Sequence, residues 1–128
     1  MKLLLDTHLL LWAAGKPEAL PEKATRLLED PQNELWFSAA SLWEVTIKAS
    51  LDRPDFEVDP HILRQGLLDN GYNELPVTSL HAVGIGSLPH IHKDPFDRLL
   101  VAQATAEALT LLTADARLAE YPGPVEKV

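Results

Sequence analysis

Short apolar segments alternate with segments of helical spacing along the chain, and this alternation restricts the fold more than any other feature. Strands are predicted at residues 2–5, 35–37, 75–77 and 109–112, with a final edge strand at 125–128. Helices are predicted at residues 7–14, 21–29, 38–51, 60–70, 79–88, 94–107 and 116–121. Such alternation is typical of α/β proteins, so we expect a three-layer α/β/α fold with a short central parallel sheet of four to five strands.

The length and the residue types limit the class of protein. A chain of 128 residues is the size of one ordinary domain, so residues 1–128 are expected to form a single domain. No apolar run approaches the roughly 18 residues of a membrane span, which favours a protein with no membrane association. The sequence has no cysteine, which excludes disulfides and thiolate ligands and suits a reducing cytoplasm.

The charge balance is acidic, with 11 basic and 19 acidic residues and a net charge of −8. This is the wrong sign for a protein that holds nucleic acid through a broad basic face. Clustered carboxylates that bind divalent cations also add negative charge, so the net charge alone does not exclude a nuclease.

Four acidic residues stand where predicted strands end or predicted helices begin. Asp6 and Asp115 follow the first and fourth strands, and Glu44 and Asp97 lie in the first turns of helices. Ligands of an open parallel sheet bind at the carboxyl ends of its strands, so the four side chains can converge there. Oxygen ligands without cysteine suit Mg²⁺ or Mn²⁺, which indicates hydrolysis of a phosphodiester.

Each acid also has a local alternative that needs no metal. Asp6 and Asp115 could cap the helices that follow them, and Ser38 and Ser41 are both candidate caps of the next helix. Ser41 and Glu44 have the spacing of a capping box. Asp94 before Pro95 has the pattern of a helix start, and Asp97 would then interact favourably with the helix dipole.

Histidine and tryptophan residues offer further hypotheses. His90, His92 and Asp94 could hold zinc or another transition metal, or could form a loop leading into a helix cap. The position of His8 beside Asp6 does not decide its role. Trp12, Trp36 and Trp43 lie in apolar surroundings and are expected in the core or on a dimer surface rather than as base-stacking platforms.

Four ordered segments together resemble the PIN domains, and among them the VapC-type toxins of toxin–antitoxin pairs. They are residues 4–8 (LLDTH), 38–45 (SAASLWEV), 92–104 (HKDPFDRLLVAQA) and 112–115 (LTAD). The resemblance implies that Asp6, Glu44, Asp97 and Asp115 are the catalytic and metal-binding acids, with Asp6 and Asp97 in direct contact with the metal. Thr7 and Thr113 match hydroxyl positions beside the site. Arg98 is a candidate contact for substrate or antitoxin, with a surface ion pair as the alternative.

The resemblance also implies an activity and partners. The expected activity is Mg²⁺- or Mn²⁺-dependent endonucleolytic cleavage of single-stranded RNA that leaves a 5′ phosphate on the downstream fragment. The expected partners are a cognate antitoxin that blocks the active site and a second copy of the chain in a homodimer.

Other classes of protein fit the sequence less well. A phospho-receiver signalling domain needs adjacent acids after its first strand and a lysine after its last, whereas Asp6 is followed by Thr7 and no lysine accompanies Thr113 to Asp115. An aspartyl phosphatase would have a second aspartate where His8 stands. A PIN-like module that only binds a partner is the remaining alternative, and the four intact acids count against it.

Overall fold

The computed structural model describes residues 1–51 and 56–128. The strands are β1 (Lys2–Leu5), β2 (Glu34–Ser38), β3 (Asn73–Leu75), β4 (Thr110–Thr113) and β5 (Val125–Lys127). The α-helices are α1 (Thr7–Gly15), α2 (Glu22–Glu29), α3 (Ala39–Ser50), α4 (Pro60–Asp69), α5 (Ser79–Gly84) and α6 (Pro95–Glu107). Short 3₁₀ turns are η1 (Pro17–Ala19), η2 (Ile85–Ser87) and η3 (Leu118–Glu120).

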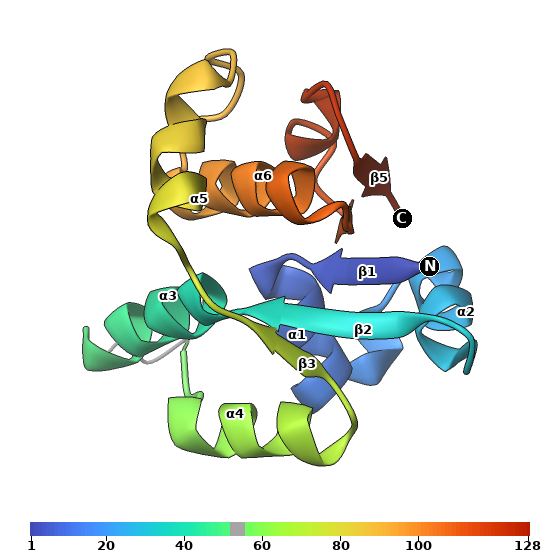
Figure 1. Ribbon diagram of the computed structural model, residues 1–128. Helices are drawn as coiled ribbons and strands as arrows, with labels where there is room; N and C mark the ends of the chain where they lie inside the picture. The colour runs from blue at the N-terminus through green and yellow to red at the C-terminus, as the bar shows by residue number, and fades with distance from the viewer. Residues whose placement is uncertain (52–55) are drawn as a thin grey trace.

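The five strands form one parallel sheet in the order β3-β2-β1-β4-β5. β1 lies at the centre, where Leu4 pairs with Trp36 of β2 on one side and with Leu111 of β4 on the other. β1 and β2 point in the same direction in Figure 1, and α3 extends from the end at which they point. The carboxyl ends of β1, β2 and β4 therefore lie along one edge of the sheet.

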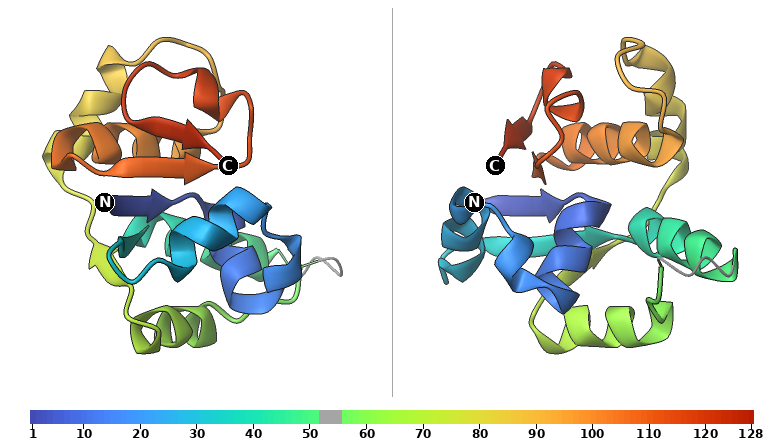
Figure 2. Two further views of the ribbon diagram at one scale, coloured as in Figure 1. Left: turned by 90° about the vertical axis from the view of Figure 1, so that its right-hand side faces the viewer. Right: turned by 180° about the vertical axis from the view of Figure 1, so that it is seen from behind.

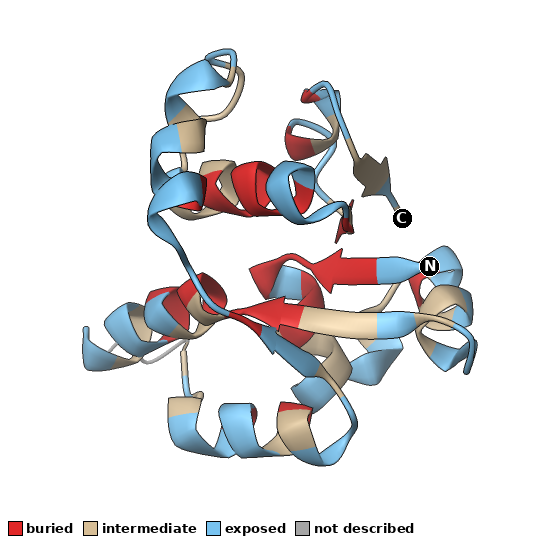
Figure 3. Cartoon of the chain, viewed as in Figure 1, coloured by how far each residue is buried: buried red, intermediate tan, exposed pale blue. Residues whose placement is uncertain are grey.

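Helices cover both faces of the sheet, as Figure 2 shows from two sides. Leu3 and Leu5 point to one face, where they join a core with side chains of α1, α2 and α4. Leu4 points to the other face and packs with Leu100 and Val101 of α6. Helix α5 packs in turn against α6 (Figure 1). Burial follows the same division, since the central strands and the inner side of α6 are buried (Figure 3). The predicted α/β/α layers are confirmed.

Three predicted elements have different limits in the structure. β3 ends at Leu75 instead of beginning there, because Pro76 has no N–H to continue the ladder. The helix predicted at 79–88 ends at Gly84 and is followed by the 3₁₀ turn η2. Glycine is a poor helix former, and this segment contains both Gly84 and Gly86. The helix predicted at 116–121 is only the turn η3.

Within the described residues, no helix is both long enough and apolar enough to cross a bilayer.

Candidate active site

Asp6 links the carboxyl ends of the neighbouring strands β1 and β4. It follows β1, caps α1 by accepting from the Leu9 N–H at 2.9 Å, and accepts from the Thr113 hydroxyl at 2.6 Å. Its side chain is almost completely buried, with 4% exposed. Burial raises the pKa of the Asp6 carboxyl, although the hydrogen bonds from Thr113 and Leu9 act in the opposite direction. The cap predicted for Asp6 is present, and Thr113 ties it to β4.

Glu44 lies on α3 and has one buried oxygen without a partner. The N-cap of α3 is Ser38, whose hydroxyl accepts from the Ala40 N–H, so Ser41 lies inside the helix and the predicted Ser41–Glu44 capping box is wrong. Ser41 accepts instead from the Thr7 hydroxyl at 3.0 Å. Glu44 Oε2 accepts from Lys48 at 2.9 Å, whereas Oε1 is buried and has no hydrogen-bond partner among the described residues. A buried, unpartnered carboxylate oxygen is costly unless a proton or a cation meets it.

Asp97 lies in the first turn of α6, which Asp94 caps as predicted. The Asp94 carboxylate accepts from the N–H groups of Phe96 and Asp97, and Pro95 is the first helical residue. Burial, together with the charges of Asp94, Asp6 and Glu44, raises the pKa of Asp97 to about 7. Asp6 follows β1, and α3, which carries Glu44, follows β2, so both acids lie at the edge where the carboxyl ends of these parallel strands meet.

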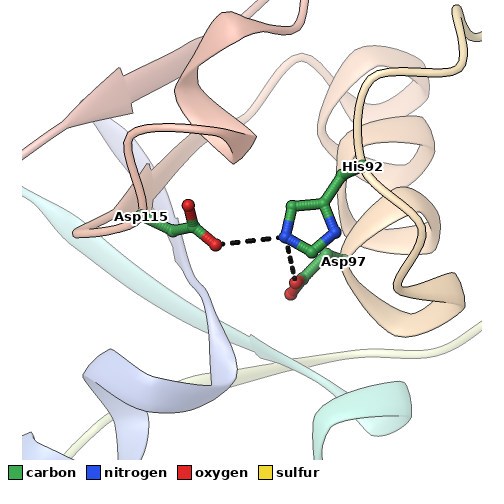
Figure 4. A group of neighbouring side chains, drawn as sticks. All are labelled: His92, Asp97 and Asp115. Carbon is green, nitrogen blue, oxygen red and sulfur yellow. Dashed lines mark hydrogen bonds and ion pairs between the residues drawn. The ribbon is translucent and has the colours of Figure 1, made fainter.

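Asp115 follows β4 and meets Asp97 through His92. Figure 4 shows the His92 ring between the two carboxylates, with Nε2 at 3.1 Å from Asp115 Oδ2 and 3.6 Å from Asp97 Oδ2. Asp115 Oδ1 accepts from the Arg117 N–H at 2.8 Å, as a local cap would. Desolvation raises the pKa of Asp115, but the hydrogen bonds from Arg117 and His92 outweigh it and lower the pKa.

We call Asp6, Glu44, Asp97 and Asp115 the acidic cluster. They come from the ends of β1 and β4, from the first turn of α6 and from the second turn of α3, where Glu44 lies one turn later than predicted because Ser38 caps the helix. Local capping and convergence are not alternatives here, because Asp6 caps a helix and belongs to the cluster at once. Thr113 is fully buried and contacts two of the acids, since it donates to Asp6 and accepts from the Asp115 N–H.

His92 is the site residue whose place the sequence did not predict. The grouping of His90, His92 and Asp94 is not formed; among the described residues, the cluster with metal-ligand geometry is His92, Asp97 and Asp115, whose ligand atoms lie within 4.8 Å of one another. The Asp94 N–H donates to His92 Nδ1 at 3.1 Å, so Nε2 carries the proton of the neutral ring and faces the carboxylates. The loop interpretation of this segment is the correct one.

Tyr121 and Arg98 hold the His92 loop. The Tyr121 hydroxyl accepts from the His92 N–H at 2.9 Å and from Arg98 at 3.1 Å, and donates to the His92 carbonyl. Arg98 also donates to the carbonyls of Pro89 and Ile85. The surface ion pair that was the alternative for Arg98 is absent from the described residues. A substrate contact by Arg98 stays a prediction.

The tryptophans differ in their surroundings. Trp12 and Trp36 are half-buried and pack against the two cores. Trp43 on α3 is 61% exposed and lies edge-on to the Phe96 ring, with centroids 5.3 Å apart. His8 is exposed, 6.2 Å from the Trp12 ring, and its role stays undecided.

Comparison with known protein families shows to which family the chain is related. The PIN domain family profile matches residues 3–124. The chain belongs to the PIN-domain family. The resemblance found in the four sequence segments is thereby confirmed.

Individual relatives agree with this membership. The PIN-domain chain is 27% identical over 121 residues to Ribonuclease VapC22 of Mycobacterium tuberculosis (strain ATCC 25618 / H37Rv), covering 94% of this chain and 92% of the relative. Its fold matches a chain in the crystal structure of VapBC2 from Rickettsia felis bound to a promoter DNA fragment, with a TM-score of 0.71, 18% identity, and coverage of 99% and 98%. A toxin–antitoxin complex from Klebsiella pneumoniae matches with a TM-score of 0.62, 20% identity, and coverage of 96% and 94%.

PIN-domain nucleases generally use a divalent metal, and the acidic cluster fits one. The unpartnered Oε1 of Glu44 and the raised pKa of Asp97 both mark carboxylates that a bound cation would stabilise. The donors are carboxylate oxygens with a single imidazole beside them. This donor set suits Mg²⁺ or Mn²⁺ and lacks the thiolates that soft metals prefer.

Proposed function

We propose that this PIN-domain protein is a Mg²⁺- or Mn²⁺-dependent endoribonuclease that hydrolyses single-stranded RNA and serves as the toxin of a type II toxin–antitoxin pair. The observation that carries the proposal is the convergence of Asp6, Asp97 and Glu44 at the carboxyl edge of the sheet, where burial and mutual repulsion raise the pKa of Asp97 to about 7. The name of the relative, Ribonuclease VapC22, supports ribonuclease activity. Residues 1–128 are proposed to act as one domain.

The chain supplies the ligands and keeps them in place. Asp6 and Asp97 would hold the cation directly, with Glu44 and Asp115 as supporting ligands. A bound divalent cation supplies the positive charge that stabilises a phosphodiester during attack by water. Thr113 fixes the Asp6 carboxylate by a 2.6 Å hydrogen bond, and Thr7 positions α1 against α3 through Ser41. We keep Thr7, Thr113 and Arg98 as candidate neighbours of the substrate.

An antitoxin and a second copy of the chain are the proposed protein partners. The structural neighbours named VapBC or toxin–antitoxin complexes support the first. Exposed apolar side chains on α3, Trp43 and Ile47, together with Leu51, which follows it, offer a surface for either partner. A cytoplasmic location would be consistent with the RNA substrate.

Asp6→Asn and Asp97→Asn test the activity. Each change keeps the size of the side chain and removes a metal ligand, so cleavage of single-stranded RNA in Mg²⁺ should fall by roughly a hundredfold or more. The measurement is the rate of fragment formation from a labelled RNA by the purified chain. Asp69→Asn, an exposed aspartate on α4, is the matched control and should cleave like the original chain.

Two results would contradict the proposal. Full activity in both Asp6→Asn and Asp97→Asn would remove the acidic cluster from catalysis. A chain with all four acids that binds an antitoxin but cleaves no RNA in Mg²⁺ or Mn²⁺ would be a PIN-like binding module instead.

A further inference from the structure

A pocket of about 430 Å³ lies beside the acidic cluster and is lined by basic residues. Its walls are His90, Ile91, His92, Lys93, Arg98 and Arg117. Five of these six side chains carry an ammonium, a guanidinium or an imidazole, and no carboxylate lines the pocket. We call it the basic pocket. In a chain of net charge −8, such a concentration of basic side chains is a local departure from the overall charge.

Lys93, Arg98 and Arg117, the permanently charged residues of the basic pocket, are not neutralised by acids among the described residues. Arg98 donates to Ile85, Pro89 and Tyr121 oxygens, and Arg117 Nε donates to the Ile91 carbonyl at 3.0 Å. These acceptors orient the guanidinium groups without cancelling their charge. Lys93 is exposed, and neither it nor the two arginines forms an ion pair with any residue of the described ranges.

Several basic residues elsewhere are paired. Lys23, Arg26, Lys48 and Arg64 each lie within ion-pair distance of a glutamate. Their charge is partly offset by that partner, whereas Lys93, Arg98 and Arg117 keep theirs available for an anion from outside the chain. The basic pocket therefore has the electrostatic character of an anion site.

His92 is shared by the basic pocket and the acidic cluster. It lines the pocket, and its Nε2 lies 3.1 Å from Asp115 and 3.6 Å from Asp97. A ligand that occupied both the acidic cluster and the basic pocket would need two anionic groups. One would meet the cation held by the acids, and the other would lie beside the arginines. A single-stranded nucleic acid has this repeat of phosphates along its backbone.

We propose that the basic pocket binds an RNA phosphate next to the scissile one, through the charges of Lys93, Arg98 and Arg117. The inference rests on the proposed function and adds to it the place where the substrate backbone is held. It also accounts for RNA binding by an acidic protein, since a few unpaired cations beside the reactive phosphate replace a broad basic face. Phosphate contacts of this kind position the strand and carry no base preference.

The test measures RNA affinity without cleavage. Lys93→Gln with Arg117→Gln is made in the Asp97→Asn background and compared with Lys2→Gln plus Lys16→Gln in the same background. Lys2 and Lys16 are exposed, and Lys2 begins β1 at the opposite edge of the sheet. Both pairs change the net charge equally, from −7 in the Asp97→Asn background to −9, because each removes two of the chain's 11 basic residues. Binding of a short fluorescent single-stranded RNA is followed by anisotropy at several salt concentrations in Mg²⁺.

The pocket variant should bind RNA about tenfold more weakly, and the slope of log affinity against log salt should shrink by about 0.7 for each phosphate that the variant no longer neutralises. The control pair should change both quantities much less. Arg117→Lys keeps the charge but removes the Nε donor to Ile91, so it should retain RNA affinity if charge is what matters. Lys93→Gln alone alters only an exposed side chain. It should also weaken RNA binding, and it replaces the double variant in the test if that variant does not fold.

Three results would overturn the inference. One is equal affinity and salt slope in the pocket variant and the control pair. Another is an RNA affinity in the Asp97→Asn background that does not change with salt concentration. The third is unchanged RNA binding while affinity for a short poly-glutamate peptide disappears, which would assign the pocket to an acidic protein segment. Failure of the proposed function is a separate outcome: the original chain would not cleave an RNA that the pocket nevertheless binds.

Discussion

Asp97 is the residue at which folding and the proposed chemistry conflict most directly. Its carboxyl is largely buried, and Asp94, Asp6 and Glu44 add negative charge around it. In the folded chain its pKa is about 7, against an ordinary value of 3.8, so ionising this group works against the native state. Buried repulsion of this kind is typical of a binding site, where a ligand supplies the compensating charge.

Asp97→Asn should stabilise the protein in a pH-dependent way when no divalent cation is present. The folded state holds the Asp97 proton more tightly than the unfolded state, so the contribution of this group to stability is complete below pH 3.8 and is lost as the pH rises through about 7. Allowing for solvent at its exposed edge, the gain in unfolding free energy from Asp97→Asn should grow by on the order of 1–2 kcal/mol from about pH 5 to about pH 8. Urea unfolding in EDTA at the two pH values measures it.

Asp69→Asn is the control for this measurement, because it removes an exposed aspartate of α4 remote from the acidic cluster. A gain in stability from Asp97→Asn that is the same at both pH values would show that the Asp97 proton is not held by the folded state.

At the scale of the element, the N-terminus of α6 positions Asp97, the catalytic candidate on this helix. Asp94 accepts from the N–H groups of Phe96 and Asp97, which fixes the first turn and the position of the Asp97 side chain. The Asp94 N–H also donates to His92 Nδ1, so one residue orders the helix start and the ring that faces Asp115. The helix cap is thus part of the construction of the site.

Asp94→Ala should therefore destabilise the chain by about 1 kcal/mol through loss of the N-cap. Asp94→Asn keeps a side-chain oxygen that can accept from the same N–H groups, and its unfolding free energy should stay close to that of the original chain. Thermal or urea unfolding of the two variants side by side measures the difference. An equal loss in both would mean that the charge of Asp94, and not its capping hydrogen bonds, stabilises α6.

The elements that follow from local rules could be predicted from the sequence. The pattern of apolar residues located the six α-helices and four of the five strands, although α5 is shorter than predicted and the helix predicted at 116–121 is only the turn η3. Asp94 before Pro95 located the start of α6. The Ser41–Glu44 capping box failed because two caps competed locally and tertiary packing chose Ser38, whose hydroxyl also donates to Gln103 at 2.6 Å. β3 lies two residues before its predicted position because Pro76 ends the ladder, an effect that apolar spacing alone does not include.

The convergence of the four acids at one edge of the sheet could be predicted, because the carboxyl ends of parallel strands share an edge. His92 was not, since its position depends on contacts with Tyr121, which is distant in sequence, and on the order of β1 beside β4. The neighbouring histidine and aspartate suggested a separate metal site, and only the fold shows which carboxylates the ring faces. The basic pocket has the same origin, because Arg117 reaches it from the loop after β4.

At the scale of the whole molecule, two opposite charge clusters lie side by side on an acidic protein. The acidic cluster and the basic pocket meet at His92, while helices on both faces of the sheet keep the strand ends from separating to relieve the repulsion. The packing of the entire fold therefore opposes the repulsion among Asp6, Glu44 and Asp97. Binding of a cation should neutralise the repulsion among these carboxylates and so stabilise the fold as a whole.

Divalent cations should accordingly raise the melting temperature of the native chain. A ligand at about 100 times its Kd adds about 2.7 kcal/mol to the unfolding free energy. For a chain of this length that corresponds to a rise of roughly 10 °C. Differential scanning fluorimetry with MnCl₂ or MgCl₂, against NaCl of equal ionic strength, separates specific binding from general screening of the net charge of −8. The double variant Asp6→Asn, Asp97→Asn should lose most of the rise, because the two ligands proposed to hold the cation are gone. The same rise in that variant, or in NaCl alone, would mean that the cation acts on the surface charge of the molecule and not at the acidic cluster.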